Sequence, residues 1–106
     1  MSANNRPVDT CLTLVIHPNL EDAVVDFLLD RAETVGHFTS RPVDAHGGDI
    51  AYETAAERVR GRARRFRIHA LMAGTHVHDL LRDLRQQFTG ADIYYWTAPV
   101  QQSGRL

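Results

Sequence analysis

The strongest chemical signal in the sequence is a cluster of arginines with no acidic residue among them. The segment 58–67 carries six of them, namely Arg58, Arg60, Arg62, Arg64, Arg65 and Arg67. A guanidinium group is a planar fork of hydrogen-bond donors that matches phosphate and carboxylate, so the cluster favours binding of a small anion. On an extended segment the four even-numbered arginines from Arg58 to Arg64 point to one side. The alternative is a solvated or edge-protecting strand that pairs with acidic residues of a neighbouring chain.

Six histidines raise the question of a metal site. His46 lies among the glycines of the segment DAHGGD, where a mobile ligand could close on a divalent ion or on a target protein. His76 and His78 are two residues apart at the start of an expected helix, which turns their rings about 200° apart. His37 and His69 lie on strands that we expect to be adjacent. None of these makes a closed tetrahedral set, so scattered structural or solvent-facing histidines remain the alternative.

Two further features have both a chemical and a structural interpretation. Cys11, the single cysteine, excludes an intrachain disulfide and fits a reducing compartment, and it is either a reactive thiol or a buried strand residue. Tyr94, Tyr95 and Trp96 could stack on a base, or fill a core or a subunit interface. The sequence contains no nucleophile elbow, P-loop, dinucleotide fingerprint or H-E-x-x-H motif. We therefore expect a protein that is not an enzyme.

The charge is distributed unevenly along 106 residues. All 12 basic residues are arginine, against 13 acidic ones, for a net charge of −1. Residues 1–57 hold three arginines and ten acids (−7), and residues 58–106 hold nine arginines and three acids (+6). The slightly acidic total and the absence of interleaved aromatics argue against nucleic acid. With no secretory signal in the first ten residues and no apolar run near the ~18 residues of a spanning helix, we expect a cytoplasmic protein without membrane insertion.

The elements that position these side chains follow from apolar periodicity and turn residues. We expect a flexible arm at 1–10 and a single domain at 11–106. Strands are predicted at 11–17, 37–43, 62–72 and 93–97. A first helix is predicted at about 20–33, with Asn19 as its N-cap and Gly36 as the residue that ends it. A second helix is predicted from the N-cap Thr75 to Phe88. The order βαββαβ predicts an α+β, ferredoxin-like sandwich, a four-stranded antiparallel sheet with both helices on one face.

The other sheet face has a mixed character. Strict alternation over 62–72 places Arg65, Arg67 and His69 on this face, together with some of the C-terminal aromatics. Such a face usually finds a partner, and self-association is the economical way to cover it.

Several segments carry a family resemblance. These are the opening CLTLVIHPNLEDAVVDFLL, the step GHFTSRPV, the glycine-containing loop, the stretch ERVRGRARRFRIHAL and the ending IYYWTAPVQQSGR. In order and spacing they resemble the PII-like superfamily of small trimeric signalling proteins that includes CutA. More narrowly, they resemble a subgroup encoded beside heavy-metal efflux pumps of the resistance-nodulation-division type.

The resemblance implies a homotrimer with effector clefts between subunits and a long T-loop, here from about Val43 to Arg58. The implied partner-docking residues of the loop are Asp44, His46, Gly47 and Gly48. The implied anion- or nucleotide-binding residues are Gly36, His37, Thr39 and Ser40 at the loop base, Arg58, Arg60, Arg62 and Arg64 on its return, Thr89 and Gly90 before the last strand, and Arg105 from a neighbour's tail.

Three functions are consistent with these observations. The first is a trimeric regulatory protein that senses a small anionic effector, with adenine nucleotides among the candidates, and modulates a membrane efflux system. The second is a metal-binding accessory protein of heavy-metal resistance, in which His46, His37 or the pair His76 and His78 collects a divalent ion. The third is an interaction trimer that binds its pump through the loop without a small ligand.

Overall fold

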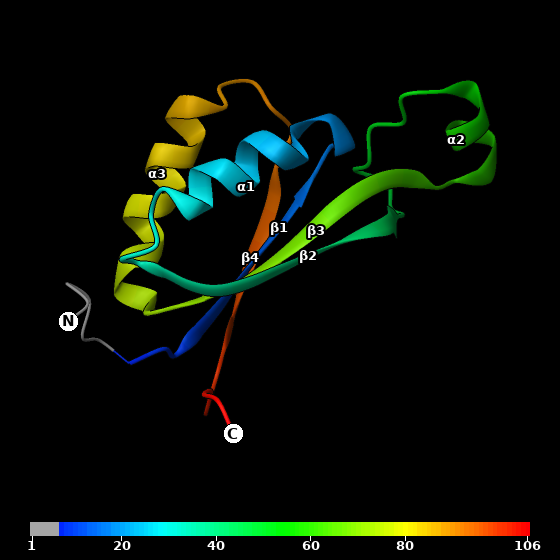
Figure 1. Cartoon of the computed structure of the whole chain (residues 1–106). Coiled ribbons are helices and arrows are strands. Elements are labelled where there is room, and N and C mark those ends of the chain that lie inside the picture. The colour runs from blue at the N-terminus through cyan, green and yellow to red at the C-terminus, as the bar shows by residue number, and fades with distance from the viewer. Residues whose placement is uncertain (1–6) are drawn as a thin grey trace.

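The structure, a computed structural model, describes residues 7–106. Its strands are β1 (Thr10–Ile16), β2 (Val35–Ala45), β3 (Ala63–Met72) and β4 (Tyr94–Pro99), and its helices are α1 (Glu21–Leu29), α2 (Ala55–Arg60) and α3 (Val77–Gln87), with short 3-10 turns at Pro18–Leu20 and Gly74–His76. The strands pair in the order β2-β3-β1-β4, and every pair is antiparallel. Figure 1 shows α1 and α3 together on one face of this sheet. The predicted ferredoxin-like α+β fold is confirmed.

The core lies between the sheet and these two helices. Alternate residues of the central strands supply one side of it, and one stripe of each helix supplies the other. Its buried members include Leu12, Leu14 and Ile16 of β1, Ile68, Ala70 and Met72 of β3, Val24, Phe27 and Leu28 of α1, and Leu80 and Leu84 of α3. Phe27 also meets Phe88 edge to face, with ring centroids 5.9 Å apart. The apolar periodicity of the sequence therefore reports the core correctly.

Both predicted helix starts are corrected. Asn19 lies within the 3-10 turn Pro18–Leu20, and the N-cap of α1 is Leu20, which makes no side-chain capping bond. Likewise, Thr75 lies within the turn that precedes α3, whose N-cap is His76. A polar residue near a helix start thus does not cap when a 3-10 turn comes between them.

The predicted end of the first helix is also wrong. The helix ends at Leu29, and Gly36 lies inside β2 beside an irregularity in the β2–β3 register between Val35 and Phe38. A Cβ added to Gly36 would lie 3.1 Å from the carbonyl oxygen of Leu71. The glycine therefore serves a close backbone approach rather than a helix stop.

Two strands are longer than predicted. β2 continues to Ala45 through Pro42, which pairs with Phe66. An edge strand such as β2 can hold a proline because the proline nitrogen need not join the ladder. β4 extends to Pro99, which pairs with Thr10, so the chain leaves the sheet two residues later than predicted.

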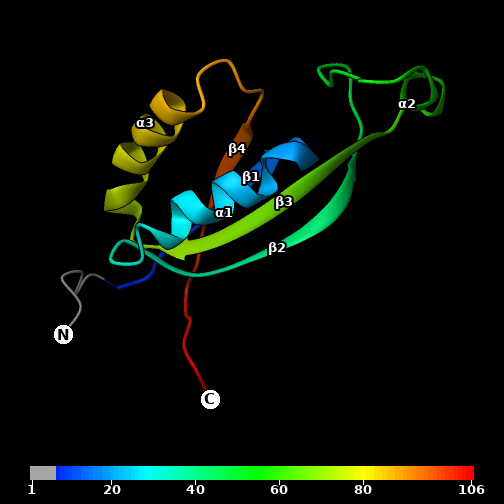
Figure 2. The same cartoon turned by 45° about the horizontal axis from the view of Figure 1, so that its top comes forward.

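The segment predicted as a plain loop contains α2. The hydroxyl oxygen of Thr54 accepts a hydrogen bond from the Glu57 backbone N–H at 3.0 Å, and Gly61, with φ of 64°, ends the helix in the left-handed region. Arg58 and Arg60 lie on this helix, so the expectation that Arg58 to Arg64 form one extended row is wrong. Figures 1 and 2 show the β2–β3 hairpin projecting past α1, with α2 beyond its end.

The beginning of the chain is tied to the sheet at Asp9. Its N–H donates to the Met72 carbonyl at 3.3 Å, and its carboxylate accepts from the Gly74 N–H at 2.8 Å. Residues 1–6 of the predicted arm lie outside the described residues. The hydrogen-bonded domain thus starts two residues before the predicted boundary at Cys11.

Candidate functional site

Four arginines gather around one groove at the base of the projecting hairpin. The groove has a volume of about 690 Å³ and is lined by Pro18, Arg41, Pro42, Val43, Asp44, Arg64, Arg65, Phe66 and Arg67. We call it the arginine groove. Asp44 is the one carboxylate among these lining residues, and its carboxylate lies 3.6 Å from the guanidinium of Arg62. The groove is therefore strongly positive, which suits an anion.

Two of the arginines face each other across the strands. Arg41 of β2 pairs directly with Arg67 of β3 in the antiparallel register, and neither forms an ion pair with another residue of the described part of the chain. Like charges directly opposite on a sheet are destabilising. An anion between the two guanidinium groups would remove this repulsion.

Arg65 is the buried member of the groove. It is 4% exposed, and its guanidinium donates to two backbone carbonyls, that of Arg64 at 2.7 Å and that of Ala51 at 2.6 Å. Both partners are neutral, so neither compensates the buried positive charge in full. Its charge also acts on Glu57, whose pKa is lowered first by the backbone N–H groups of Arg64 and Glu53 and then by Arg65.

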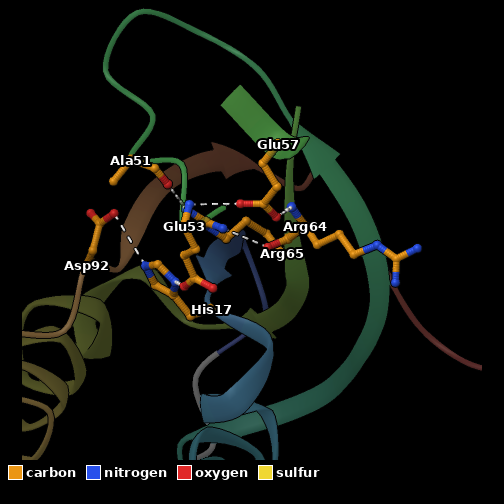
Figure 3. Close-up of polar contacts among 7 residues, drawn as sticks. All are labelled: His17, Ala51, Glu53, Glu57, Arg64, Arg65 and Asp92. Carbon is orange, nitrogen blue, oxygen red and sulfur yellow. Dashed lines mark hydrogen bonds and ion pairs between the residues drawn. The ribbon is translucent and has the colours of Figure 1, made fainter. Parts of the chain in front are cut away.

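The loop between β2 and β3 folds back onto the end of the sheet. There the His17 Nδ1 is hydrogen-bonded to the carboxylate of Glu53, and the His17 Nε2 lies 3.6 Å from the carboxylate of Asp92 (Figure 3). Together with the bond from Arg65 to Ala51, these contacts form what we call the loop junction (His17, Ala51, Glu53, Arg65 and Asp92). It joins the loop to the end of β1 and to the turn before β4.

Glu57 holds the loop internally beside this junction. Its two carboxylate oxygens accept from the Glu53 N–H at 2.9 Å and from the Arg64 N–H at 3.0 Å, as Figure 3 shows. The Arg64 side chain itself points away from the junction. One carboxylate oxygen of Glu57 thus binds the loop, and the other binds β3, the strand that lines the arginine groove.

Three of the predicted effector residues line grooves, but two different ones. Thr89 and Gly90 line an open groove of about 480 Å³ with His17, Glu53 and Asp92. Arg64 lines the arginine groove.

Other predicted effector residues do not lie where expected. Gly36, His37, Thr39 and Ser40 belong to the first half of β2, whereas the loop follows the strand's last residue, Ala45, so they are not at the loop base. Arg105 belongs to the tail beyond Pro99, and Figure 1 shows the C-terminal end of the chain at the opposite end of the sheet from α2. Arg58 and Arg60 lie on α2, away from the groove lining.

The predicted metal residue His46 has a structural contact. Its Nδ1 donates to the Gly61 carbonyl at 2.7 Å, which bridges the two sides of the loop. Over residues 7–106, no group of three His, Cys, Asp or Glu side chains is arranged to hold a metal ion. The other expected docking residues, Gly47 and Gly48, are exposed in the turn after β2.

In the same part of the chain no helix is both long and apolar enough to cross a membrane.

Sequence reasoning missed Arg41, His17, Glu53 and Asp92, and it counted Arg65 and Arg67 without assigning them to the site. The capping pattern Thr54-x-x-Glu57 could have revealed α2 and the position of Glu57. The groove has no comparable signal, because Arg41 and Arg67 meet only through strand pairing.

Comparison with known proteins identifies the family of the chain and the solved structures that share its fold. No curated protein matches the chain. A DUF3240 family protein from Shewanella baltica has the same fold, with a TM-score of 0.75 and 18% identity over 95% of this chain and 99% of that one. CPII, a nitrogen regulatory PII-like protein from Thiomonas intermedia bound to ADP, AMP and bicarbonate, matches with a TM-score of 0.66 and 17% identity over 94% of this chain and 98% of that one. At such identities these matches show that the chain shares the fold of PII-like proteins. The family model described as "Protein of unknown function (DUF3240)" matches residues 7–106, and the chain therefore belongs to the DUF3240 family.

Proposed function

We propose that this protein is a PII-like regulatory protein that binds a small anionic effector in the arginine groove. The observation that carries the proposal is the strand register, which sets Arg41 opposite Arg67, two arginines that form no ion pair with another residue of 7–106. A phosphate or carboxylate placed between them gains two forked contacts and cancels their repulsion. Arg64 and Arg65 also line this groove and add to its positive charge.

The nature of the effector follows from charge and from the fold. Four arginines and one carboxylate among the lining residues favour a ligand with more than one negative charge. The similarity in fold to CPII, which is bound to ADP, AMP and bicarbonate, supports adenine nucleotides and bicarbonate as the first candidates. The role is that of a sensor rather than an enzyme.

We also propose that the active form is a homotrimer. Register places Trp96 opposite Thr13 and Tyr94 opposite Val15, on the sheet face that α1 and α3 leave open. Trp96 is 44% and Tyr94 57% exposed in the single chain. Neighbouring copies would cover these rings, and a neighbour's tail would bring Arg105 towards the groove.

The loop is the proposed contact with a partner, for which the family resemblance suggests a heavy-metal efflux system in the membrane. The six residues of α2 include no buried side chain, and Val59 is 87% exposed between Arg58 and Arg60. An exposed apolar side chain flanked by charge, together with the turn at His46, Gly47 and Gly48, suits protein docking.

Calorimetry and light scattering test the proposal. We expect a trimer that binds at least one of ATP, ADP, AMP, cyclic AMP and bicarbonate at low salt, and that loses at least about ten-fold in affinity in Arg67→Gln. The matched control is Arg82→Gln, because Arg82 of α3 is already paired with Asp79 and Asp83 at 3.3 and 3.4 Å. A trimer that binds none of these anions, or equal losses in both variants, would contradict the arginine groove as the site.

A further inference from the structure

We propose that His69 makes the self-association of this protein depend on pH: the neutral imidazole allows copies to pack through the open sheet face, and its protonation separates them. This inference rests on the homotrimer of the proposed function and adds a means of regulating it. It concerns the sheet face that α1 and α3 leave uncovered, and it requires no ligand in the arginine groove.

His69 lies in the middle of that face. Register sets it between Thr39 of β2 and Thr13 of β1, and Trp96 of β4 completes this row across the sheet. Thr13 is 2% exposed although no helix covers this face, so the neighbouring side chains of the row shield it. The His69 ring is half-buried in the single chain.

A copy packed over Trp96 also reaches His69. The two residues lie two strands apart, which is about 10 Å at the usual strand spacing. A stable interface covers about 800 Å² of each partner, so it extends well beyond this distance. Association through the aromatic side chains of β4 therefore takes the imidazole of His69 out of water.

His69 also lies at a boundary in the charge of the face. In the next row towards the loop, Arg67 pairs with Arg41. The next row away from the loop consists of Leu71, Cys11 and Ala98. None of these three rows contains a carboxylate. A positive charge on the imidazole would therefore be uncompensated where copies meet.

The titratable and charged neighbours of His69 are few. On β3 Arg67 is two residues away, on β2 Arg41 and His37 are each two residues from Thr39, and on β1 Cys11 is two residues from Thr13. Within residues 7–106 the His69 ring forms no hydrogen bond or ion pair. Partial burial, and next the charge of Arg67, lower the pKa of His69 from its ordinary value.

The sign of the pH effect follows from burial. Packing a copy over the face removes more water from the imidazole, which lowers its pKa further. A group whose pKa falls on association opposes association once it is protonated, so the trimer weakens as the pH falls below the pKa of the free chain. Each copy contributes one His69. We expect the protein concentration at half-dissociation to rise at least about ten-fold from about pH 8 to about pH 5.5.

Sedimentation velocity of the full chain across this pH range measures the dependence. His69→Gln has no titrating group at this position and should stay trimeric throughout, and His69→Asn is a second neutral variant that guards against a packing defect in the first. His69→Arg keeps a positive charge at every pH and should be monomeric at about pH 8, at concentrations where the parent is trimeric. Circular dichroism at each pH separates dissociation from unfolding.

His78→Gln is the matched control. His78 is exposed on α3, on the other side of the sheet, so this variant should dissociate in acid as the parent does.

The outcomes separate this inference from the proposed function. A parent that is equally trimeric at every pH would overturn the pH dependence and leave the trimer intact. Acid dissociation of both neutral variants to the same extent as the parent would also overturn it, because another group would then be titrating. A parent that is monomeric at about pH 8 would contradict the trimer and the pH dependence together, while calorimetry would still test the arginine groove.

Discussion

Arg41 and Arg67 lie directly opposite each other on neighbouring strands, and neither has an acidic partner among the described residues. In the free protein the repulsion between these two positive charges lowers the free energy of unfolding. Such a pair is unusual on a surface that has only a structural role. The proposed anion would remove this cost. The groove would then store part of the free energy that favours the proposed ligand.

A first prediction follows from this repulsion. Arg41→Gln should raise the free energy of unfolding by about 0.5 kcal/mol at low ionic strength, because one of two opposed charges is removed. Urea unfolding measures it, and the gain should shrink in about 0.5 M salt, which screens the pair. Arg82→Gln, which removes a paired arginine, should show no gain. A gain that is independent of salt would point to a cause other than charge.

A second prediction concerns the open sheet face. Register places Trp96 on that face, and it places Tyr95 opposite Leu14 on the helix-covered face, although both are partly exposed at the sheet edge. Trp96→Asp should therefore dissociate the proposed trimer, since it would bury a charge between copies. Tyr95→Asp should leave the molar mass unchanged in light scattering. A trimer that survives Trp96→Asp would show that another surface holds the copies together.

A third prediction separates structure from ligand binding at Gly36. An added Cβ would meet the Leu71 carbonyl oxygen at 3.1 Å, so Gly36→Ala should cost roughly 1 kcal/mol of stability as β2 shifts. Because Gly36 does not line the arginine groove, we expect unchanged anion affinity in calorimetry. Gly48→Ala is the control, because its Cβ would meet nothing within 4 Å. A clear loss of anion affinity in Gly36→Ala would restore this residue to the effector site.

A fourth prediction is a pH dependence at Asp9. The Gly74 N–H, and next the Thr10 hydroxyl, lower the pKa of Asp9 in the folded protein below its ordinary value. The ionised carboxylate therefore stabilises the fold near neutral pH, and this contribution is lost as the pH falls through the folded-state pKa.

Asp9→Asn tests that dependence. The variant should be less stable than the parent near pH 7, and the difference should close as the acid range is reached. Urea unfolding at several pH values measures this, with Asp26→Asn, at an exposed position of α1, as the matched control. A difference between parent and Asp9→Asn that stays constant with pH would exclude a role for the Asp9 charge.

Much of the fold was predictable because the residues that a strand or helix buries recur in the sequence at a regular spacing. Alternation over 62–72 predicted β3 to within one residue, and it separated Ile68, Ala70 and Met72 from the face of Arg67 and His69. The helix α2 was missed for the complementary reason. Its helical state depends on the caps Thr54 and Gly61 and buries no side chain, so no apolar stripe marks it.

The candidate site was predictable only in its chemistry. A density of arginine that favours an anion is a property of the sequence, and it directed attention to β3. Which arginines meet depends on how β2 pairs with β3, and that register shifts at the irregularity between Val35 and Phe38. A shift of one residue would turn Arg41 to the other face, and no local pattern around Arg41 specifies it.

The sequence by itself determined the order of the four strands and of the two helices that cover the sheet, the residues of the core and the kind of ligand that the arginines favour, because these depend on residue type and local spacing. Tertiary structure alone decided that Arg41 faces Arg67, that Arg65 holds the loop through Ala51, and that His17 meets Glu53, 36 positions away in the chain. These contacts join segments through strand register and loop path. Both are set by the packing of the whole domain rather than by neighbours in sequence.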